Sequence, residues 1–133
     1  MPVDPSILGF SNAWYEPALR HAEGVKIDDL EIQVITAPYF LATKLEAFHG
    51  RGKSDFRSRD LEDIVTVVDG RAELSAEVRN SDGNLRQYLS RELSGLLSNR
   101  DFMEALPGHL LSDAASQQRL NLIVERMREL IRT

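Results

Sequence analysis

The chain contains no cysteine, and this absence removes three classes of site. Without thiols there is no disulfide framework, no thiolate zinc centre and no cysteine nucleophile. The chain also lacks any apolar run that approaches the roughly 20 residues of a membrane-spanning helix. Residues 1–5 lack the basic flank and apolar centre of a signal peptide. The expected location is therefore the cytoplasm.

The length and charge of the chain indicate one globular domain. The 133 residues suit a single core, so the expected domain covers residues 1–133. A net charge of −5 argues against binding to an extended nucleic acid. A local cationic patch on such an acidic body suits one phosphate group, and a solvated loop is the alternative interpretation. The basic residues that form this patch in the sequence are Lys44, Arg51, Lys53, Arg57 and Arg59.

Helical periodicity dominates the rest of the chain and predicts an α+β fold that is predominantly helical. Ser58 and Asn99 stand where side chains cap the first turn of a helix. One or two strands and about six helices are expected. The expected helices cover residues 12–24, 36–50, 58–70, 72–78, 85–97 and 113–131, with a further short turn at 99–106.

One strand is predicted, at residues 30–35, where apolar and polar residues alternate with the period of a half-buried strand. A single strand cannot satisfy its own backbone hydrogen bonds. It must pair with residues 1–10, with a second chain, or with sequence that this chain does not contain. An unpaired strand edge also invites a protein partner or self-association into a homo-oligomer.

The segment Lys44 to Asp63, KLEAFHGRGKSDFRSRDLED, carries most of the chemistry. Lys44 lies between Phe40 and Phe48 on the i, i+4 ladder of its predicted helix. Burying an ammonium costs several kcal/mol unless an anion compensates for it. Lys44 therefore either extends to solvent or meets a phosphate or carboxylate, and both interpretations stay open.

Asp60 and Asp63 open the next predicted helix, where the helix dipole favours each carboxylate by roughly 0.3–1 kcal/mol. A structural role accounts for Asp60, and Asp63 is placed to face Lys44 across the helix pair. A catalytic or metal-binding role is the second interpretation, because Mg²⁺ prefers carboxylates that converge with phosphate oxygens. The three histidines show no metal-ligand spacing, and no metal ligand is assigned.

Three segments, MPVDPSILGFSNAWYEPAL, ITAPYFLATKLEAFHGRG and RDLEDIVTVVDGR, resemble nucleotidyltransferase-like proteins related to the AbiEii toxin family. These are bacterial proteins of the abortive-infection and toxin–antitoxin type. The resemblance covers roughly residues 1–110, and the C-terminal helix at 111–133 adds nothing diagnostic. It implies a polymerase-β-like nucleotidyltransferase fold, transfer of a nucleotide from an NTP to an acceptor, and Mg²⁺ as cofactor.

The resemblance also implies roles for individual residues. Lys44, Asp60 and Asp63 match the family's later motifs and are the candidate catalytic residues. Lys44, Arg51 and Lys53 are the candidate nucleotide-binding residues, with Lys44 on the phosphates.

The sequence departs from the family in one respect that bears on activity. The family's metal site uses an Asp-x-Asp pair after a Gly-Ser or Gly-Gly helix, and a third carboxylate on a later strand. None of these stands in this sequence. The chain therefore resembles the back half of the family pattern, a remnant of the fold expected to be inactive alone. The alternative is an independent helical interaction module that docks a partner through the strand edge and the Trp14 region.

Overall fold

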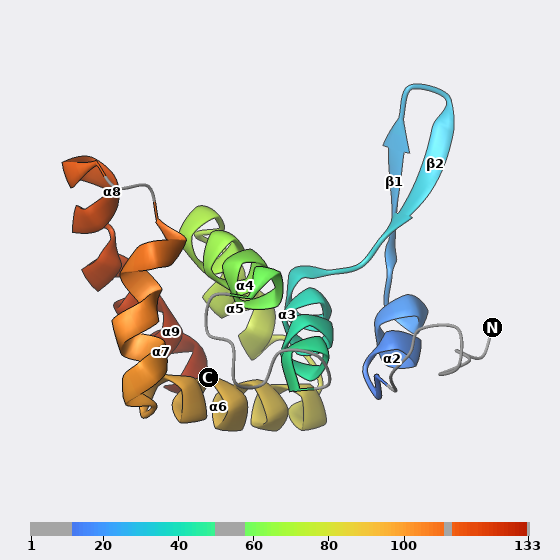
Figure 1. The fold of residues 1–133 in the computed structure, drawn as a ribbon. Helices are drawn as coiled ribbons and strands as arrows, with labels where there is room; N and C mark the ends of the chain where they lie inside the picture. The colour runs from blue at the N-terminus through green and yellow to red at the C-terminus, as the bar shows by residue number, and fades with distance from the viewer. Residues whose placement is uncertain (1–11, 50–57, 111–112, 133) are drawn as a thin grey trace.

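The structure is a computed structural model of the chain, and it describes residues 12–49, 58–110 and 113–132. The predicted α+β class, predominantly helical with one small sheet, is confirmed (Figure 1). No helix in these three ranges is both long enough and apolar enough to cross a bilayer. The elements are α2 (Tyr15–Arg20), β1 (Glu23–Ile27), β2 (Leu30–Val34), α3 (Ala37–Ala47), α4 (Arg59–Gly70), α5 (Leu74–Arg79), α6 (Gly83–Leu97), α7 (Arg100–Ala105), η2 (Leu106–His109), α8 (Ala114–Gln118) and α9 (Leu120–Arg132).

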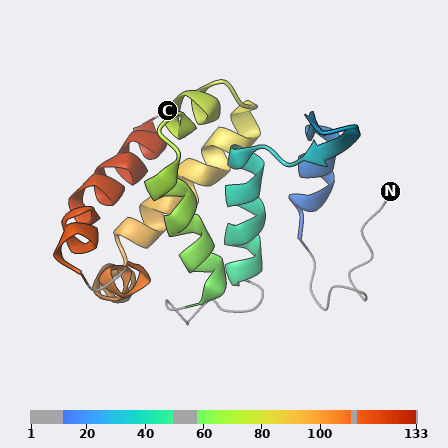
Figure 2. The same ribbon diagram turned by 90° about the horizontal axis from the view of Figure 1, so that it is seen from above.

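The four longest helices build the core. Helix α3 packs against α4 and α6, and α9 packs against α4, α5 and α6 (Figure 2). The helical spacing of apolar residues in α4 forms a buried stripe, made of Leu61, Ile64, Val65 and Val68. The largest side chains of the core that are fully buried are Leu41, Leu45, Leu61, Ile64, Leu85, Leu89, Leu93, Phe102, Leu106, Ile123, Met127 and Leu130.

Two predicted helix caps are confirmed. The Ser58 hydroxyl accepts a hydrogen bond from the Leu61 amide at 3.4 Å at the start of α4. The Asn99 side chain accepts one from the Phe102 amide at 3.1 Å at the start of α7. Each cap satisfies one of the amides that a helix start leaves without a partner.

The prediction of a lone strand is wrong. Strand β2 pairs antiparallel with β1, which precedes it directly, so that Val25 lies opposite Ile32 and Ile27 opposite Leu30. In the turn between them Asp28 has a φ of 55°, a left-handed conformation that aspartate tolerates better than most residues. Helix α2 ends at Arg20 and not near Gly24, because the chain is already in β1 by Glu23.

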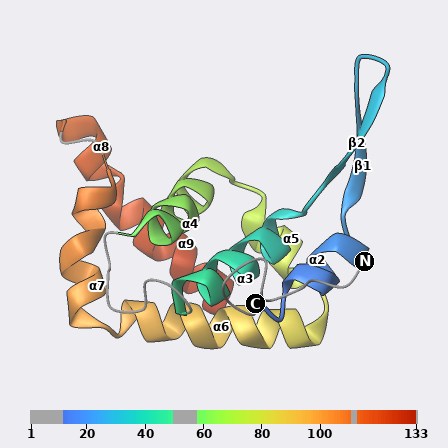
Figure 3. The same cartoon turned by 45° about the vertical axis from the view of Figure 1, so that its right-hand side comes forward.

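The predicted half-burial of the strand is also wrong, because every residue of β1 and β2 is exposed. The hairpin projects away from the helical body, as Figures 1 and 3 show. The alternation of apolar and polar residues is real, but its apolar side does not face the core.

The Trp14 region, expected as part of a docking surface, packs inward in the structure. The Trp14 ring lies 5.0 Å from the Tyr88 ring and 6.4 Å from the Tyr39 ring, measured between centroids. These contacts hold α2 against α3 and α6.

Candidate functional site

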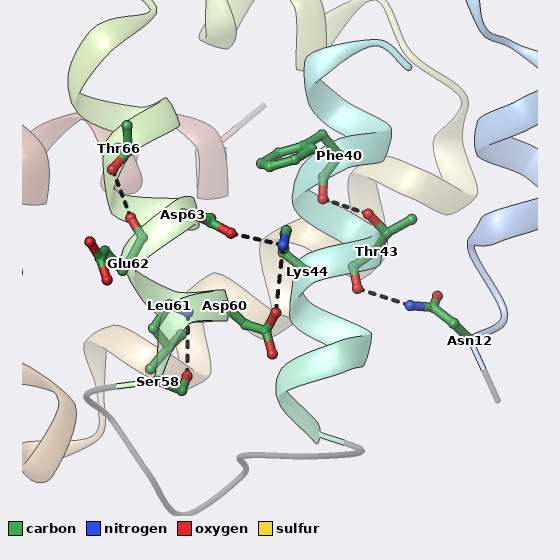
Figure 4. Close-up of polar contacts among 10 residues, drawn as sticks. All are labelled: Asn12, Phe40, Thr43, Lys44, Ser58, Asp60, Leu61, Glu62, Asp63 and Thr66. Atoms are coloured by element: carbon green, nitrogen blue, oxygen red, sulfur yellow. Dashed lines mark hydrogen bonds and ion pairs between the residues drawn. The ribbon is translucent and has the colours of Figure 1, made fainter. Parts of the chain in front are cut away.

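Helices α3 and α4 lie side by side and bring Lys44 to Asp60 and Asp63 (Figure 4). The Lys44 Nζ is 2.8 Å from Asp63 Oδ2 and 3.7 Å from Asp60 Oδ1. The two carboxylates share one face of α4 because residues three apart are neighbours on a helix surface. Asp63 therefore faces Lys44, as its position in the sequence suggests.

The three side chains differ in burial, and this difference separates their roles. The Asp60 side chain is 8% exposed, Lys44 is 25% exposed and Asp63 is 35% exposed. A buried carboxylate needs compensation for the water that it loses. Lys44 and the dipole at the start of α4 supply part of this compensation to Asp60. Asp63 is the accessible member of the pair, and it makes the shorter contact with the ammonium.

The Lys44 side chain is further held by α3 itself. Its Nζ lies 5.6 Å from the centroid of the Phe40 ring, within the range of a cation–π interaction. The Thr43 hydroxyl donates to the Phe40 carbonyl at 2.8 Å, and the buried Asn12 amide donates to the Thr43 carbonyl at 2.9 Å (Figure 4). The Asn12 side chain also accepts a hydrogen bond from the Trp14 amide at 3.1 Å. Its tie to α3, 31 residues away, has no signal in the sequence.

A Mg²⁺ ion does not fit between these side chains. The Lys44 ammonium already occupies the space between the two carboxylates that a divalent cation would need. Elsewhere in the described ranges, no three His, Asp or Glu side chains converge as metal ligands. What the described residues form here is an ion-pair cluster of one ammonium and two carboxylates.

Arg51 and Lys53, the other predicted nucleotide-binding residues, lie outside the described residues, in the segment that joins α3 to α4. Their roles stay predictions. The roles of Lys44, Asp60 and Asp63 toward a ligand stay predictions as well, since what the structure shows is their mutual geometry.

A second polar cluster lies between α3 and α6. The Tyr88 hydroxyl donates to Glu46 Oε1 at 2.6 Å, and His49 Nε2 lies 2.6 Å from Glu92 Oε2. Burial raises the pKa of Tyr88 above its ordinary value, and the hydrogen bond to Glu46 raises it further. Sequence reasoning missed this cluster because its partners are more than 40 residues apart. It joins the helix of Lys44 to the longest helix of the body.

A groove of about 600 Å³ opens beside the Lys44 cluster. Its lining comes from the base of the hairpin, the start of α3, the second half of α4 and the paired Arg71 and Glu77 that follow, so no single sequence segment reveals it. Phe40 and Thr66 line the groove, and Phe40 also underlies the Lys44 ammonium. The groove and the lysine are therefore neighbours on one surface.

Comparison with known proteins identifies the family. The family model of the nucleotidyl transferase AbiEii toxin, of type IV toxin–antitoxin systems, matches residues 8–131. This range includes the Lys44 cluster, the hairpin and most of α9. No curated protein and no solved structure matches the chain. Since the match covers most of its length, the chain belongs to the AbiEii nucleotidyl transferase toxin family.

Proposed function

We propose that this chain binds the phosphates of a nucleoside triphosphate at Lys44, as part of nucleotide transfer to an acceptor. The observation that supports the proposal is the position of the ammonium, held at 2.8 Å from Asp63 while a quarter of the side chain stays exposed. An ammonium has three N–H donors, and two carboxylates engage two of its sides. A phosphate oxygen then has a fixed, accessible cation to contact.

In this proposal the two carboxylates are positioning residues. Asp60, nearly buried, holds Lys44 against α4 in the presence and absence of ligand. Asp63 is more exposed and competes with phosphate for the same ammonium. Binding of the nucleotide displaces Asp63 toward solvent, and Arg51 and Lys53 supply additional positive charge to the phosphates.

Transfer itself needs chemistry that Lys44 does not supply. Metal ions bridge the phosphates in nucleotidyl transfer and neutralise the charge that develops there. The family implies Mg²⁺ and NTP, and the described residues do not fit the metal. The proposal is therefore that the chain alone binds nucleotide and is inactive until a second protein chain provides the metal ligands.

A protein contact through the hairpin completes the proposal. Strands β1 and β2 expose apolar side chains, and each offers an unpaired backbone edge within the described structure. Such an edge is a template for pairing or docking. A protein partner or a second copy of the chain is proposed to dock there.

Isothermal titration tests nucleotide binding directly. ATP, CTP, GTP and UTP with Mg²⁺ are titrated into the intact chain and into Lys44→Met, which keeps the apolar stem and removes the charge. We expect saturable binding that Lys44→Met weakens at least tenfold, about 1.4 kcal/mol. Lys26→Met on the exposed hairpin is the matched control and keeps the affinity.

The nucleotide affinity of Asp63→Asn distinguishes two roles of Asp63, as a competitor of phosphate for Lys44 or as the residue that orients Lys44. If phosphate competes with Asp63 for Lys44, removal of the Asp63 charge strengthens nucleotide binding. If Asp63 instead orients Lys44 for the ligand, the same variant weakens it, which contradicts the competition. Absence of binding by a folded wild-type chain, with the fold checked by circular dichroism, rejects the nucleotide proposal.

A further inference from the structure

One face of the hairpin is apolar and exposed. The register places Val25 opposite Ile32 and Ile27 opposite Leu30, and the alternation of a strand puts Val34 on the same side. These five side chains are between 40% and 68% exposed, and they account for most of the large exposed apolar side chains in the described ranges. We call this surface the hairpin face.

An exposed apolar face on a two-stranded sheet is not a stable end state. Two strands alone are marginal in water, and a sheet normally buries its apolar side against another element. A contiguous exposed apolar patch marks an interaction site. The position of the hairpin, projecting from the helical body, leaves this face accessible to a partner (Figure 3).

The charges around the face indicate what kind of partner fits. Lys26 lies opposite Glu31 on the polar side of the hairpin, where the two charges offset each other. The remaining charges are carboxylates at the two ends of the hairpin, Glu23 at its base and Asp28 and Asp29 at its tip. The hairpin face is therefore framed by negative charge at both ends.

This charge pattern argues against a second copy as the occupant. Two hairpin faces packed together bring carboxylates near carboxylates, whether the tips of the two copies point the same way or opposite ways. Like charges brought together across an interface disfavour that pairing, and opposite charges favour it. A cationic partner meets both ends of the face with complementary charge.

The length and shape of the surface indicate a helix. Strands of five residues are about 17 Å long, which about 11 residues of α-helix span. The face also continues into the groove of about 600 Å³, since Val25 and Val34 line it together with Ile35, Phe40 and Val67. A helix along the hairpin can therefore place an apolar side chain into the groove.

We infer that the hairpin face and its groove bind a cationic amphipathic helix of about three turns from a protein partner, with Leu, Ile or Val on one side and Lys or Arg beside them. This inference deepens the protein contact proposed above and does not depend on nucleotide binding at Lys44. The docked helix lies beside Phe40, and through it beside Lys44.

Three 14-residue peptides test the inference against the intact chain, by titration calorimetry and by circular dichroism. The first places Leu and Lys at helical spacing, the second has the same composition in strict alternation, and the third replaces each Lys with Glu. We expect the first to bind and gain helicity, with weaker binding at higher salt. The Glu peptide is expected not to bind. Equal or tighter binding of the alternating peptide would contradict the inference that the partner is a helix.

Variants separate the hairpin face from nonspecific attraction to an acidic protein. The double variant Val25→Thr, Ile32→Thr keeps β-branched side chains in the strands. It is expected to lower the affinity for the helical peptide at least tenfold. Leu122→Thr, at an exposed apolar position on α9, is the matched control and keeps the affinity.

Analytical ultracentrifugation of the same variants tests the second copy. The wild-type chain could form a dimer that is lost in the Val25→Thr, Ile32→Thr variant. That result would support a contact through the hairpin face but reject a cationic helix as its partner. If no peptide binds and the chain does not self-associate, both the cationic helix and the second copy are rejected as partners. The nucleotide titration of the Lys44 variant is unaffected by this result.

Discussion

The Lys44 cluster places one cation between two carboxylates of unequal burial. Asp60 is shielded from water, so its interaction with Lys44 is little weakened by solvent, whereas Asp63 interacts across a partly exposed surface. The contact with Asp60 is therefore expected to contribute more to stability than the shorter contact with Asp63. The distance between the charged atoms does not predict the contribution of each ion pair to stability, because that contribution depends on how buried the pair is.

This difference predicts unequal effects of two chemically identical substitutions. Asp60→Ala is expected to lower the free energy of unfolding by about 2 kcal/mol, because it leaves Lys44 with less compensation in a largely buried position. Asp63→Ala is expected to cost less than about 1 kcal/mol, as surface ion pairs do. Urea denaturation of both variants measures the difference. Equal losses would show that burial does not separate the two carboxylates.

At the scale of elements, helix α4 carries both carboxylates and depends on its first turn for its position. Ser58 starts it, and the apolar stripe of Leu61, Ile64, Val65 and Val68 holds it against the core. A shift of the first turn would move Asp60 away from Lys44. The cap of α4 is therefore part of what positions the site.

Ser58→Ala is expected to destabilise the protein by about 1 kcal/mol, since it removes the side-chain acceptor of the Leu61 amide. Thr66→Ala in the same helix is the control. The exposed Thr66 hydroxyl only donates back to the Glu62 carbonyl, so its loss is expected to be neutral or slightly stabilising. Thermal unfolding followed by circular dichroism compares the two, and similar losses would argue against the cap.

The sequence pattern predicts only one of the two strands of the hairpin. A second alternating segment was present in the sequence, with Val25 and Ile27 flanking Lys26 just before the predicted strand. The two aspartates between the segments are turn residues. The helix predicted over residues 12–24 overlaps the first two residues of β1, so the prediction leaves the strand at 30–35 without its neighbour in the chain.

At the scale of the whole molecule, contacts between distant segments fix how the helices sit. Arg126 of α9 donates to the Val68 and Asp69 carbonyls at the end of α4, and Arg119 pairs with Asp69 at 2.7 Å. On the other side of the body, Tyr88 ties α6 to α3 through Glu46. Both carbonyls at the end of α4 thus find donors in the last helix, as helix ends require.

Because of Tyr88, the free energy of unfolding is expected to depend on pH in the alkaline range. The pKa of Tyr88 is raised in the folded state above its ordinary value of 10.0, mainly by burial. Its contribution to stability is therefore complete below pH 10.0 and declines above it, as the unfolded chain loses the proton first.

Tyr88→Phe is expected to cost about 2 kcal/mol at neutral pH, where the hydrogen bond to the Glu46 carboxylate is lost. The gap between wild type and variant should narrow between about pH 10 and 11, by up to about 1.4 kcal/mol per pH unit. Urea denaturation across this range measures the gap. A gap that stays constant with pH would show that Tyr88 titrates alike in the folded and unfolded chain.

The sequence by itself determined most of the helices, the caps at Ser58 and Asn99, and the placement of Asp63 opposite Lys44. These features depend on residues within a turn of one another, or on two helices joined by a short segment. Only the tertiary structure decided that the strand residues are exposed, that Trp14 packs inward and that Tyr88 meets Glu46. The reason is physical: periodicity shows which side of an element is apolar, while burial depends on what the rest of the chain places opposite that side.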